Sequence, residues 1–138
     1  MSKIPTDLQI LERIYADYAA TFRSYSDEAQ TRNNVNYVPI DVNDLASKLK
    51  THPNELFGRL YYHLDHKYRY KQDGGGSVHL FTLAIAGDRH CIHFPYLAAL
   101  LAERRTEHRR NFFSIVISIV SLMVALAALL AQFSAQPA

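Results

Sequence analysis

The feature that most constrains this chain is a run without any charged side chain, residues 112–133. Most of its 22 residues are Leu, Ile, Val, Ala, Phe or Met. As an α-helix the run spans roughly 33 Å, which suits the ~30 Å hydrocarbon core of a bilayer. The alternative is a buried core helix, but the 94 residues ahead of the connector could hardly surround a helix that is apolar on every side. The sequence therefore predicts one transmembrane helix.

Basic residues flank this run on its N-terminal side only, at Arg104, Arg105, Arg109 and Arg110. Residues 134–138 contain no basic side chain. Positively charged flanks stay in the cytoplasm. We therefore expect a single-pass, tail-anchored protein with a cytoplasmic N-terminal domain, its C-terminus across the membrane and its arginines at anionic lipid headgroups.

Small and polar residues recur along the run at steps of four and three. They are Ser114, Ser118, Ser121, Ala125, Ala128 and Gln132. This spacing places them on one stripe of a helix, where small side chains let two helix backbones approach closely. The stripe predicts self-association or pairing with another membrane helix. The alternative is that residues common in membrane spans fall into register by chance.

The part of the chain that precedes the connector, residues 1–94, is electrically balanced. It holds eleven Lys and Arg and eleven Asp and Glu, so the net positive charge of the chain lies beside the apolar run. Cys91 is the only cysteine, which excludes an intrachain disulfide and fits a reducing compartment. The first seven residues have no apolar core, so we expect no signal peptide.

Hydrophobic spacing in residues 1–94 predicts a mixed α+β domain. Thr6 and Asp41 are expected to cap helices, and Pro53 to occupy a first helical turn. The expected elements are helices over 7–22, 42–49 and 54–66, an extended segment at 37–40, strands at 68–71 and 78–85 around a turn at 73–77, a turn at 86–89 and a short segment at 91–94.

This order resembles the winged helix-turn-helix family over about residues 5–94. Residues 42–49 are similar to its second helix, 53–66 to its third, the recognition helix, and 68–85 to its wing. The resemblance implies DNA binding, with the third helix in the major groove. Arg59 would face a base edge, and Arg69 and Lys71, on one face of the wing strand, would contact phosphates.

The local charges argue against DNA. Arg59 is the one clear cation expected on the outward face of the recognition helix, where Glu55 and Asp65 oppose it. Phosphate neutralisation supplies most non-specific DNA affinity, and this domain has no net positive charge. Solvated side chains are the simpler interpretation of Arg69 and Lys71. A Tyr-rich domain without net charge suits protein docking better.

Two short histidine motifs invite a metal or catalytic interpretation. They are residues 63–66, His-Leu-Asp-His, and 90–93, His-Cys-Ile-His. Neither has a recognised spacing of zinc ligands, and histidines at the edge of a core explain both. Cys91 is more simply a small buried residue than a nucleophile. The Gly-rich turn at 73–77 has neither the Lys nor the following helix of a phosphate-binding loop. We therefore predict no enzyme, no metal and no cofactor.

The fold class expected is α+β: a small winged-helix-like domain followed by one long helix that ends in a single transmembrane span. The parts are a domain at 1–94, a basic helical connector at 95–111, the span at 112–133 and a short tail at 134–138. Pro95 can start the connector, whose leucines would dock on the domain, and no Gly or Pro interrupts it before residue 133.

Three functions fit this organisation. The first is a membrane-anchored interaction or signalling module that docks a cytoplasmic protein and self-associates through its span. The second is a membrane-tethered DNA-binding transcriptional regulator. In the third, the span is a subunit of a larger membrane complex and the domain is its regulatory cap. The balanced charge of the domain favours the first over the second.

Overall fold

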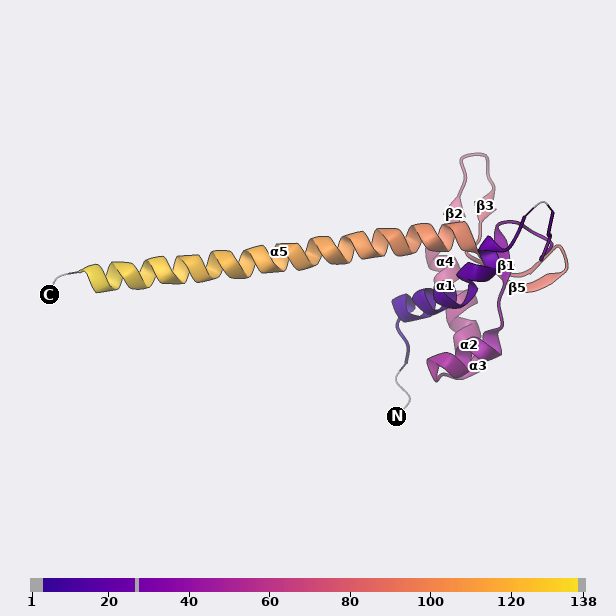
Figure 1. The fold of residues 1–138 in the computed structure, drawn as a ribbon, viewed down its shortest axis with the longest axis horizontal. Helices are drawn as coiled ribbons and strands as arrows, with labels where there is room; N and C mark the ends of the chain where they lie inside the picture. The colour runs from indigo at the N-terminus through magenta and orange to yellow at the C-terminus, as the bar shows by residue number, and fades with distance from the viewer. Residues whose placement is uncertain (1–3, 27, 137–138) are drawn as a thin grey trace. The chain divides into compact units, whose positions relative to one another are not determined.

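The computed structural model describes residues 4–26 and 28–136, and it is of the mixed α+β class (Figure 1). The chain divides into two units, Met1–Leu101 and Ala102–Ala138. The first unit holds the short helices, the strands and a hydrophobic core. The second consists of one helical segment, whose described residues are all exposed. Of the predicted tail, residues 137–138 lie outside the described part.

Helix α1 (Asp7–Arg23) begins as the sequence predicts, with Thr6 as its N-cap. The Thr6 hydroxyl oxygen accepts from the Gln9 amide, and the Gln9 side chain accepts from the Thr6 amide, which completes a capping box. The helix buries Ile10, Leu11 and Ile14. Its start is therefore fixed by the cap and its orientation by the core.

The polar stretch after α1 is organised by Arg32, which is 7% exposed. Its guanidinium donates to the carbonyl oxygens of Thr21 and Phe22 at the end of α1, and to those of Asn34 and Val35. This buried cation thus donates to four carbonyl groups, two of them at a helix end, where carbonyl oxygens lack their intrahelical partners.

The next two helices also begin at the predicted residues. The Asp41 carboxylate caps α2 (Val42–Leu49), and Pro53 starts α3 (Pro53–Gly58). α3 continues as a π-helical segment, η1 (Arg59–Leu64), and then as α4 (Asp65–Tyr68). The expected single helix over 54–66 is therefore one helical run with a change of hydrogen-bond pattern in its middle. Leu56, Leu60 and Leu64 are buried along it.

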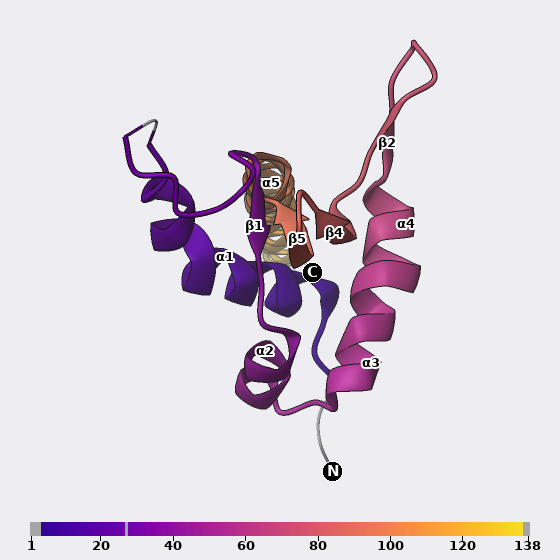
Figure 2. The same cartoon turned by 90° about the vertical axis from the view of Figure 1, so that its right-hand side faces the viewer.

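The core sheet has three antiparallel strands in the order β1-β5-β4, seen side by side in Figure 2. They are β1 (Tyr37–Pro39), β4 (Phe81–Ile85) and β5 (Asp88–His93). Val38 lies opposite Ile92, which in turn lies opposite Phe81, and all three are buried. Of the short segment expected at 91–94, residues 91–93 are therefore the end of the central strand, and residue 94 begins the next helix.

The predicted wing is wrong in its connections. The strand expected over 78–85 is two strands, β3 (Ser77–Val78) and β4, because the chain turns inward to bury Leu80. β3 pairs only with β2 (Tyr70–Lys71), in a separate hairpin around the Gly-rich turn. β4 instead pairs with β5.

Ala86 and Gly87 connect β4 to β5, and both have positive φ, 49° and 94°. Two consecutive left-handed residues are what a two-residue hairpin of type I′ requires. The turn expected at 86–89 is therefore the tight connection of the main hairpin, and Asp88 and Arg89 already belong to β5.

Helix α5 (Phe94–Ala135) is continuous, as predicted, although it starts one residue before Pro95. Its first turns belong to the first unit, where Phe94, Leu97, Leu100 and Leu101 are buried in the core. The prediction that these leucines dock on the domain is confirmed. From Ala102 onward the helix belongs to the second unit and has no buried residue among those described.

Candidate functional site

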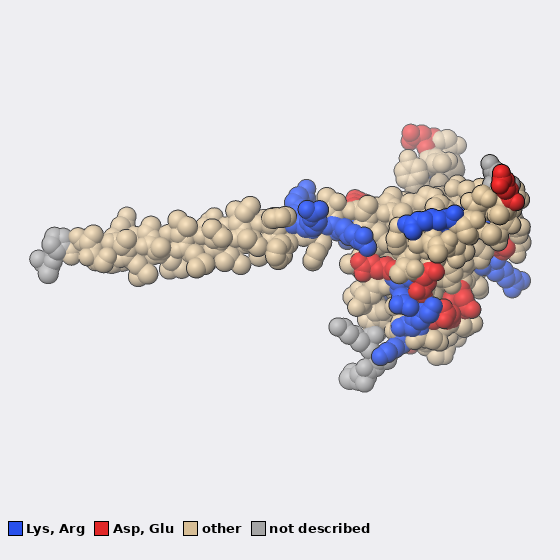
Figure 3. All heavy atoms as spheres, viewed as in Figure 1, with Lys and Arg blue, Asp and Glu red and all other residues tan. Residues whose placement is uncertain are grey.

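The second unit contains a helix that is long and apolar enough to cross a membrane. None of its apolar window is buried by the protein itself. Figure 3 shows Lys and Arg gathered at one end of this stretch, followed by uncharged side chains to the end of the described helix. The predicted interface residues Arg104, Arg105, Arg109 and Arg110 make up this basic end and are all exposed.

The charges at this basic end are unevenly distributed around the helix. With 100° per residue, Arg104, His108, Arg105 and Arg109 fall within an arc of about 140°, whereas Glu103, Glu107 and Arg110 lie in the remaining arc. Arg104 pairs with Glu107 at 3.9 Å. The helix therefore has a basic side and a mixed side.

The predicted small-residue stripe lies along the same helix, and its residues are exposed. The Ser118 hydroxyl donates to the carbonyl oxygen of Ser114, and the Ser121 hydroxyl donates to that of Ile117, both at 2.9 Å. These two hydroxyls are therefore satisfied within their own helix. Any helix pairing through the stripe must rest mainly on close packing.

The three predicted DNA contacts have separate environments. Arg59 pairs with Asp7 on α1 and not with Glu55 or Asp65. Arg69 caps the end of α4 and does not lie on a wing strand with Lys71; its Nη2 lies 2.8 Å from the Asp65 carboxylate. Lys71 lies on β2, exposed, and takes part in no ion pair within the described residues. The structure does not bring the three cations together on one partner.

Asp65 was expected on the outward face of the recognition helix, and this expectation is wrong. Its side chain is only 4% exposed, and it accepts from Arg69, from His79 Nδ1 at 3.0 Å and from the Phe81 amide at 3.1 Å. Burial pushes the pKa of Asp65 upward, but these hydrogen bonds outweigh it and leave the pKa below its usual value. Asp65 fastens α4 to the start of β4.

A second carboxylate, Asp7 in the first turn of α1, receives three side chains from the helical run α3–η1–α4. Arg59 pairs with its Oδ1, while His63 Nε2 and Lys67 Nζ lie 3.1 Å and 3.4 Å from its Oδ2. Partial burial favours a higher pKa for Asp7, but the hydrogen bonds from Arg59, His63 and Lys67 have the larger effect and leave its pKa below the usual value. The spacing of the three basic residues by four could have indicated a shared partner, although not which one.

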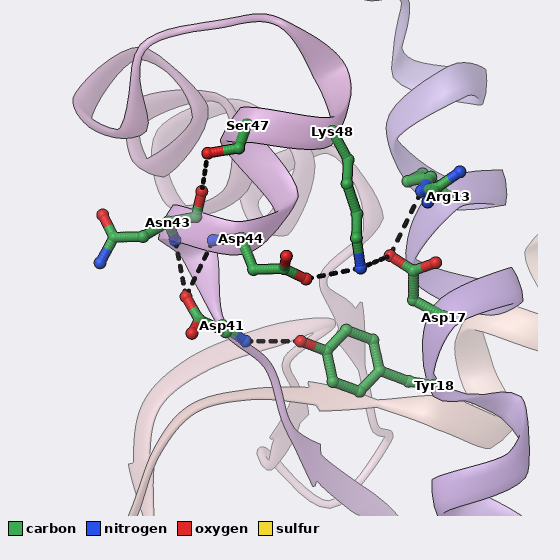
Figure 4. A network of polar contacts seen from close by, with 8 residues as sticks. All are labelled: Arg13, Asp17, Tyr18, Asp41, Asn43, Asp44, Ser47 and Lys48. Atoms are coloured by element: carbon green, nitrogen blue, oxygen red, sulfur yellow. Dashed lines mark hydrogen bonds and ion pairs between the residues drawn. The ribbon is translucent and has the colours of Figure 1, made fainter.

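A third polar cluster joins α1 to α2 (Figure 4). Lys48 Nζ lies between Asp17, at 3.1 Å, and Asp44, at 2.6 Å, and Arg13 also pairs with Asp17. Nearby, the Asp41 amide donates to the Tyr18 hydroxyl oxygen at 2.7 Å. Two cations meet two carboxylates here, so this cluster is balanced in charge.

An aromatic group lies where the helical run meets the main hairpin. Phe57 and Tyr61 rings are 4.5 Å apart, and the Tyr61 hydroxyl donates to the carbonyl oxygen of Thr82 and lies 3.1 Å from His90 Nδ1. Burial, with smaller contributions from Cys91 and Asp65, raises the pKa of Tyr61 to about 12. Tyr62 extends this group into solvent and is 79% exposed.

The histidine motifs form no metal site in the part of the chain that the structure describes, where no group of three potential ligands occurs. Cys91 is buried in the central strand. Burial and the nearby Asp88 raise the pKa of its thiol, so the thiol stays protonated at neutral pH.

Comparison with known proteins found no family model, no curated protein and no solved structure that matches this chain.

Proposed function

We propose that the protein is a membrane-anchored interaction module, held by the apolar part of α5 and docking a protein partner through its folded first unit. The observation that carries this proposal is the 22-residue uncharged segment, none of which the chain itself buries. An apolar helix of this length exposed to water would be strongly unfavourable, since each buried Leu or Ile side chain is worth about 1.5–3 kcal/mol. A bilayer provides the missing apolar environment.

The basic end supports one orientation of this anchor. Four arginines precede the apolar segment, and each contributes about 1 kcal/mol near an anionic leaflet. By the positive-inside rule this end faces the cytoplasm, and so does the first unit. To test the orientation, an N-glycosylation site is introduced either before the segment or after it, at residue 136. We expect glycosylation only at residue 136. Glycosylation of the site before the segment would show the opposite orientation.

Docking of a protein is favoured over DNA binding by the environments of the basic residues. Arg59 and Arg69 are each engaged by a carboxylate, Asp7 or Asp65, and must be released before they could neutralise phosphates. In contrast, the exposed Tyr62, with the half-buried Phe57 and Tyr61 behind it, offers an aromatic surface. Aromatic residues are enriched in protein interfaces.

A winged-helix arrangement remains part of the proposal. It is supported by the order α1, β1, α2, α3 followed by a hairpin, and by a sheet in which β1 pairs with the last strand of that hairpin. The wing in this arrangement is the β4–β5 hairpin, and β2–β3 is an additional one. Such domains serve both as DNA readers and as protein-docking modules, so the fold alone does not decide the function.

Membrane anchoring is tested with Val120→Arg combined with Val124→Arg. Each arginine near the centre of a span costs about 2.5–3.5 kcal/mol, so the variant should leave the alkali-resistant membrane fraction. The control adds two arginines at exposed apolar positions of the first unit, Val35→Arg with Leu83→Arg, and should stay with the membrane. Extraction of the unaltered chain by alkali would refute the anchor.

The choice between a protein and DNA as partner is tested by measuring the binding of DNA duplexes of mixed sequence to the intact chain in detergent, at ~50 and ~200 mM salt. We expect no binding. Salt-sensitive binding that is lost in Lys71→Ala would favour the tethered regulator instead.

Self-association of the span belongs to the proposal through its small-residue stripe. Cysteines introduced separately at position 121, on the stripe, and at position 122, beside it, should crosslink with different yields in membranes. Equal yields would contradict a specific seam.

A further inference from the structure

The most unusual polar contact of the first unit is the convergence of three basic side chains on Asp7. Arg59, His63 and Lys67 follow each other at intervals of four along the helical run, and all reach the two oxygens of this one carboxylate. They are partly exposed, with 33%, 52% and 41% of their side-chain surfaces accessible. The three side chains therefore surround a position that already holds an anion and can be reached from solvent.

The charges at this position do not balance. One carboxylate faces two permanent cations, Arg59 and Lys67, together with His63. The cluster at Asp17 differs, because Lys48 and Arg13 there meet two carboxylates, Asp17 and Asp44. A residual positive charge close to solvent favours an anion that carries more than the single charge of a carboxylate.

The guanidinium of Arg59 is also incompletely used. Its Nη2 donates to Asp7, whereas its Nε is buried and lacks a hydrogen-bond partner within the described structure. A buried donor without an acceptor is rare and calls for an explanation, such as a ligand oxygen. Phosphate oxygens commonly accept from both Nε and Nη2 of an arginine as a bidentate pair. In addition, Arg59 begins the π-helical segment η1, and π-turns are frequent at functional sites.

We propose that Arg59, His63 and Lys67 form a binding site for the phosphate group of a small phosphate monoester, and that the Asp7 carboxylate fills this site when no ligand is bound. The site uses none of the residues of the aromatic surface. It suits one isolated anion, because the three side chains converge on a single carboxylate. The phosphates of a duplex are spaced along the backbone and would require cations that diverge.

Ligand binding requires only a rotation of the Asp7 side chain. Asp7 is the first residue of α1, and its side chain is 24% exposed, so it can turn toward solvent. The helix itself stays in place, because the Thr6–Gln9 capping box and the buried Ile10 and Leu11 hold it. A phosphate dianion replaces one negative charge with two and gives Arg59 Nε its acceptor.

The test is a titration of inorganic phosphate into the intact chain in detergent micelles at constant ionic strength, followed through the NMR signals of the His63 ring. We expect saturable binding that becomes about tenfold tighter in Asp7→Asn, where the internal competitor loses its charge; this corresponds to 1.4 kcal/mol. Asp17→Asn is the matched control, because Asp17 also lies on α1 and pairs with two cations, and it should leave the affinity unchanged. Far-UV circular dichroism verifies that each variant is folded.

A second variant removes a proposed ligand and leaves Asp7 in place. Lys67→Gln, at an exposed position near the end of the helical run, should weaken phosphate binding at least fivefold. The proposal is overturned if Asp7→Asn binds phosphate no better than the unaltered chain, or if Asp17→Asn gains as much. It is also overturned if the chain binds duplex DNA but not inorganic phosphate, which would assign these cations to the tethered regulator.

Discussion

Leu97 and Leu122 belong to the same helix, α5, but lie in different environments. Leu97 is fully buried in the first unit, whereas Leu122 in the second is 63% exposed. The same holds for the residues around them: Leu100 and Leu101 belong to the core, while every described residue from Ala102 onward is exposed. The core residues of the first unit are covered by the chain itself, whereas the apolar residues of the second need cover from outside it.

The basic residues of the two units differ in the same way. In the first unit, Lys48, Arg59 and Arg69 each contact at least one carboxylate, and Arg32 is satisfied by carbonyl groups. In the second, Arg104 and Glu107 form a long ion pair, at 3.9 Å. Interactions within the chain thus engage many of the charges of the first unit, and leave most of those of the second available to a charged surface.

The largest effect that separates the two environments is expected from one substitution made at both leucines. Leu97→Ala should lower the free energy of unfolding of the first unit by about 2–5 kcal/mol, because it removes buried methyl groups and leaves a cavity. Leu122→Ala should leave that free energy unchanged. Urea denaturation of the intact chain in detergent, followed by tyrosine fluorescence, measures both. Equal effects would mean that the two units do not differ in the way described here.

Sequence patterns predicted the elements whose signals are local. Thr6, Asp41 and Pro53 mark helix starts by their own chemistry, and the uncharged run marks a helix whatever surrounds it. The strand pairing was not predictable in this way. The sequence predicts one strand over residues 78–85, but the strand is interrupted at His79 and Leu80. The interruption arises because Leu80 enters the core and the Phe81 amide donates a hydrogen bond to Asp65. Both causes are contacts with residues distant in the sequence.

The polar sites show the same limit. Asp65 falls at a helical position that looks exposed, and only the return of the chain at His79 and Phe81 buries it. The partner of Arg59 is Asp7, which lies 52 residues away. Spacing along a helix indicates which side chains share a face, but not what covers that face.

Asp65→Asn tests how much the carboxylate contacts of the first unit contribute to its stability. A buried carboxylate that accepts from a cation, a histidine and an amide typically contributes about 1.5–3 kcal/mol, which the neutral side chain should largely lose. Since folding lowers the pKa of Asp65, its contribution is fully present above the pKa of an unfolded Asp, about 3.9, and is lost as the pH falls through the folded pKa.

The measurement is the free energy of unfolding of both proteins between pH 3 and pH 7. The gap between Asp65→Asn and the unaltered chain should be constant near neutrality and narrow under acid conditions. A gap that does not change with pH would show that the ionised form of Asp65 is not what stabilises the fold.

The basic side of the second unit should respond to lipid charge. Arg105→Gln combined with Arg109→Gln removes two exposed cations and should weaken the preference for anionic over zwitterionic lipid by about 1 kcal/mol per arginine. The matched control, Glu103→Gln with Glu107→Gln, changes the same number of charges on the other side of the helix and should not weaken it. The retention of anionic lipid by the purified chain, measured by native mass spectrometry, distinguishes the two. A loss of lipid in the control alone would contradict the assignment of the basic side.

The smallest effect concerns the backbone. Lys50 ends α2 with φ at 55°, and the amides of Lys50 and Thr51 donate back to Ser47 and Ala46, as in a Schellman motif. A left-handed residue with a Cβ is strained, so Lys50→Gly should stabilise the first unit by up to about 1 kcal/mol, whereas Lys50→Ala, which removes the charge but keeps the Cβ, should not. In the second unit the backbone is a regular helix, and Ala102→Gly should weaken it locally by about 1 kcal/mol, seen as faster amide hydrogen exchange. Glycine thus has opposite effects at the two positions, because Lys50 has a positive φ and Ala102 lies in a regular helix. Stabilisation by Lys50→Ala equal to that by Lys50→Gly would assign the effect to charge and not to the backbone.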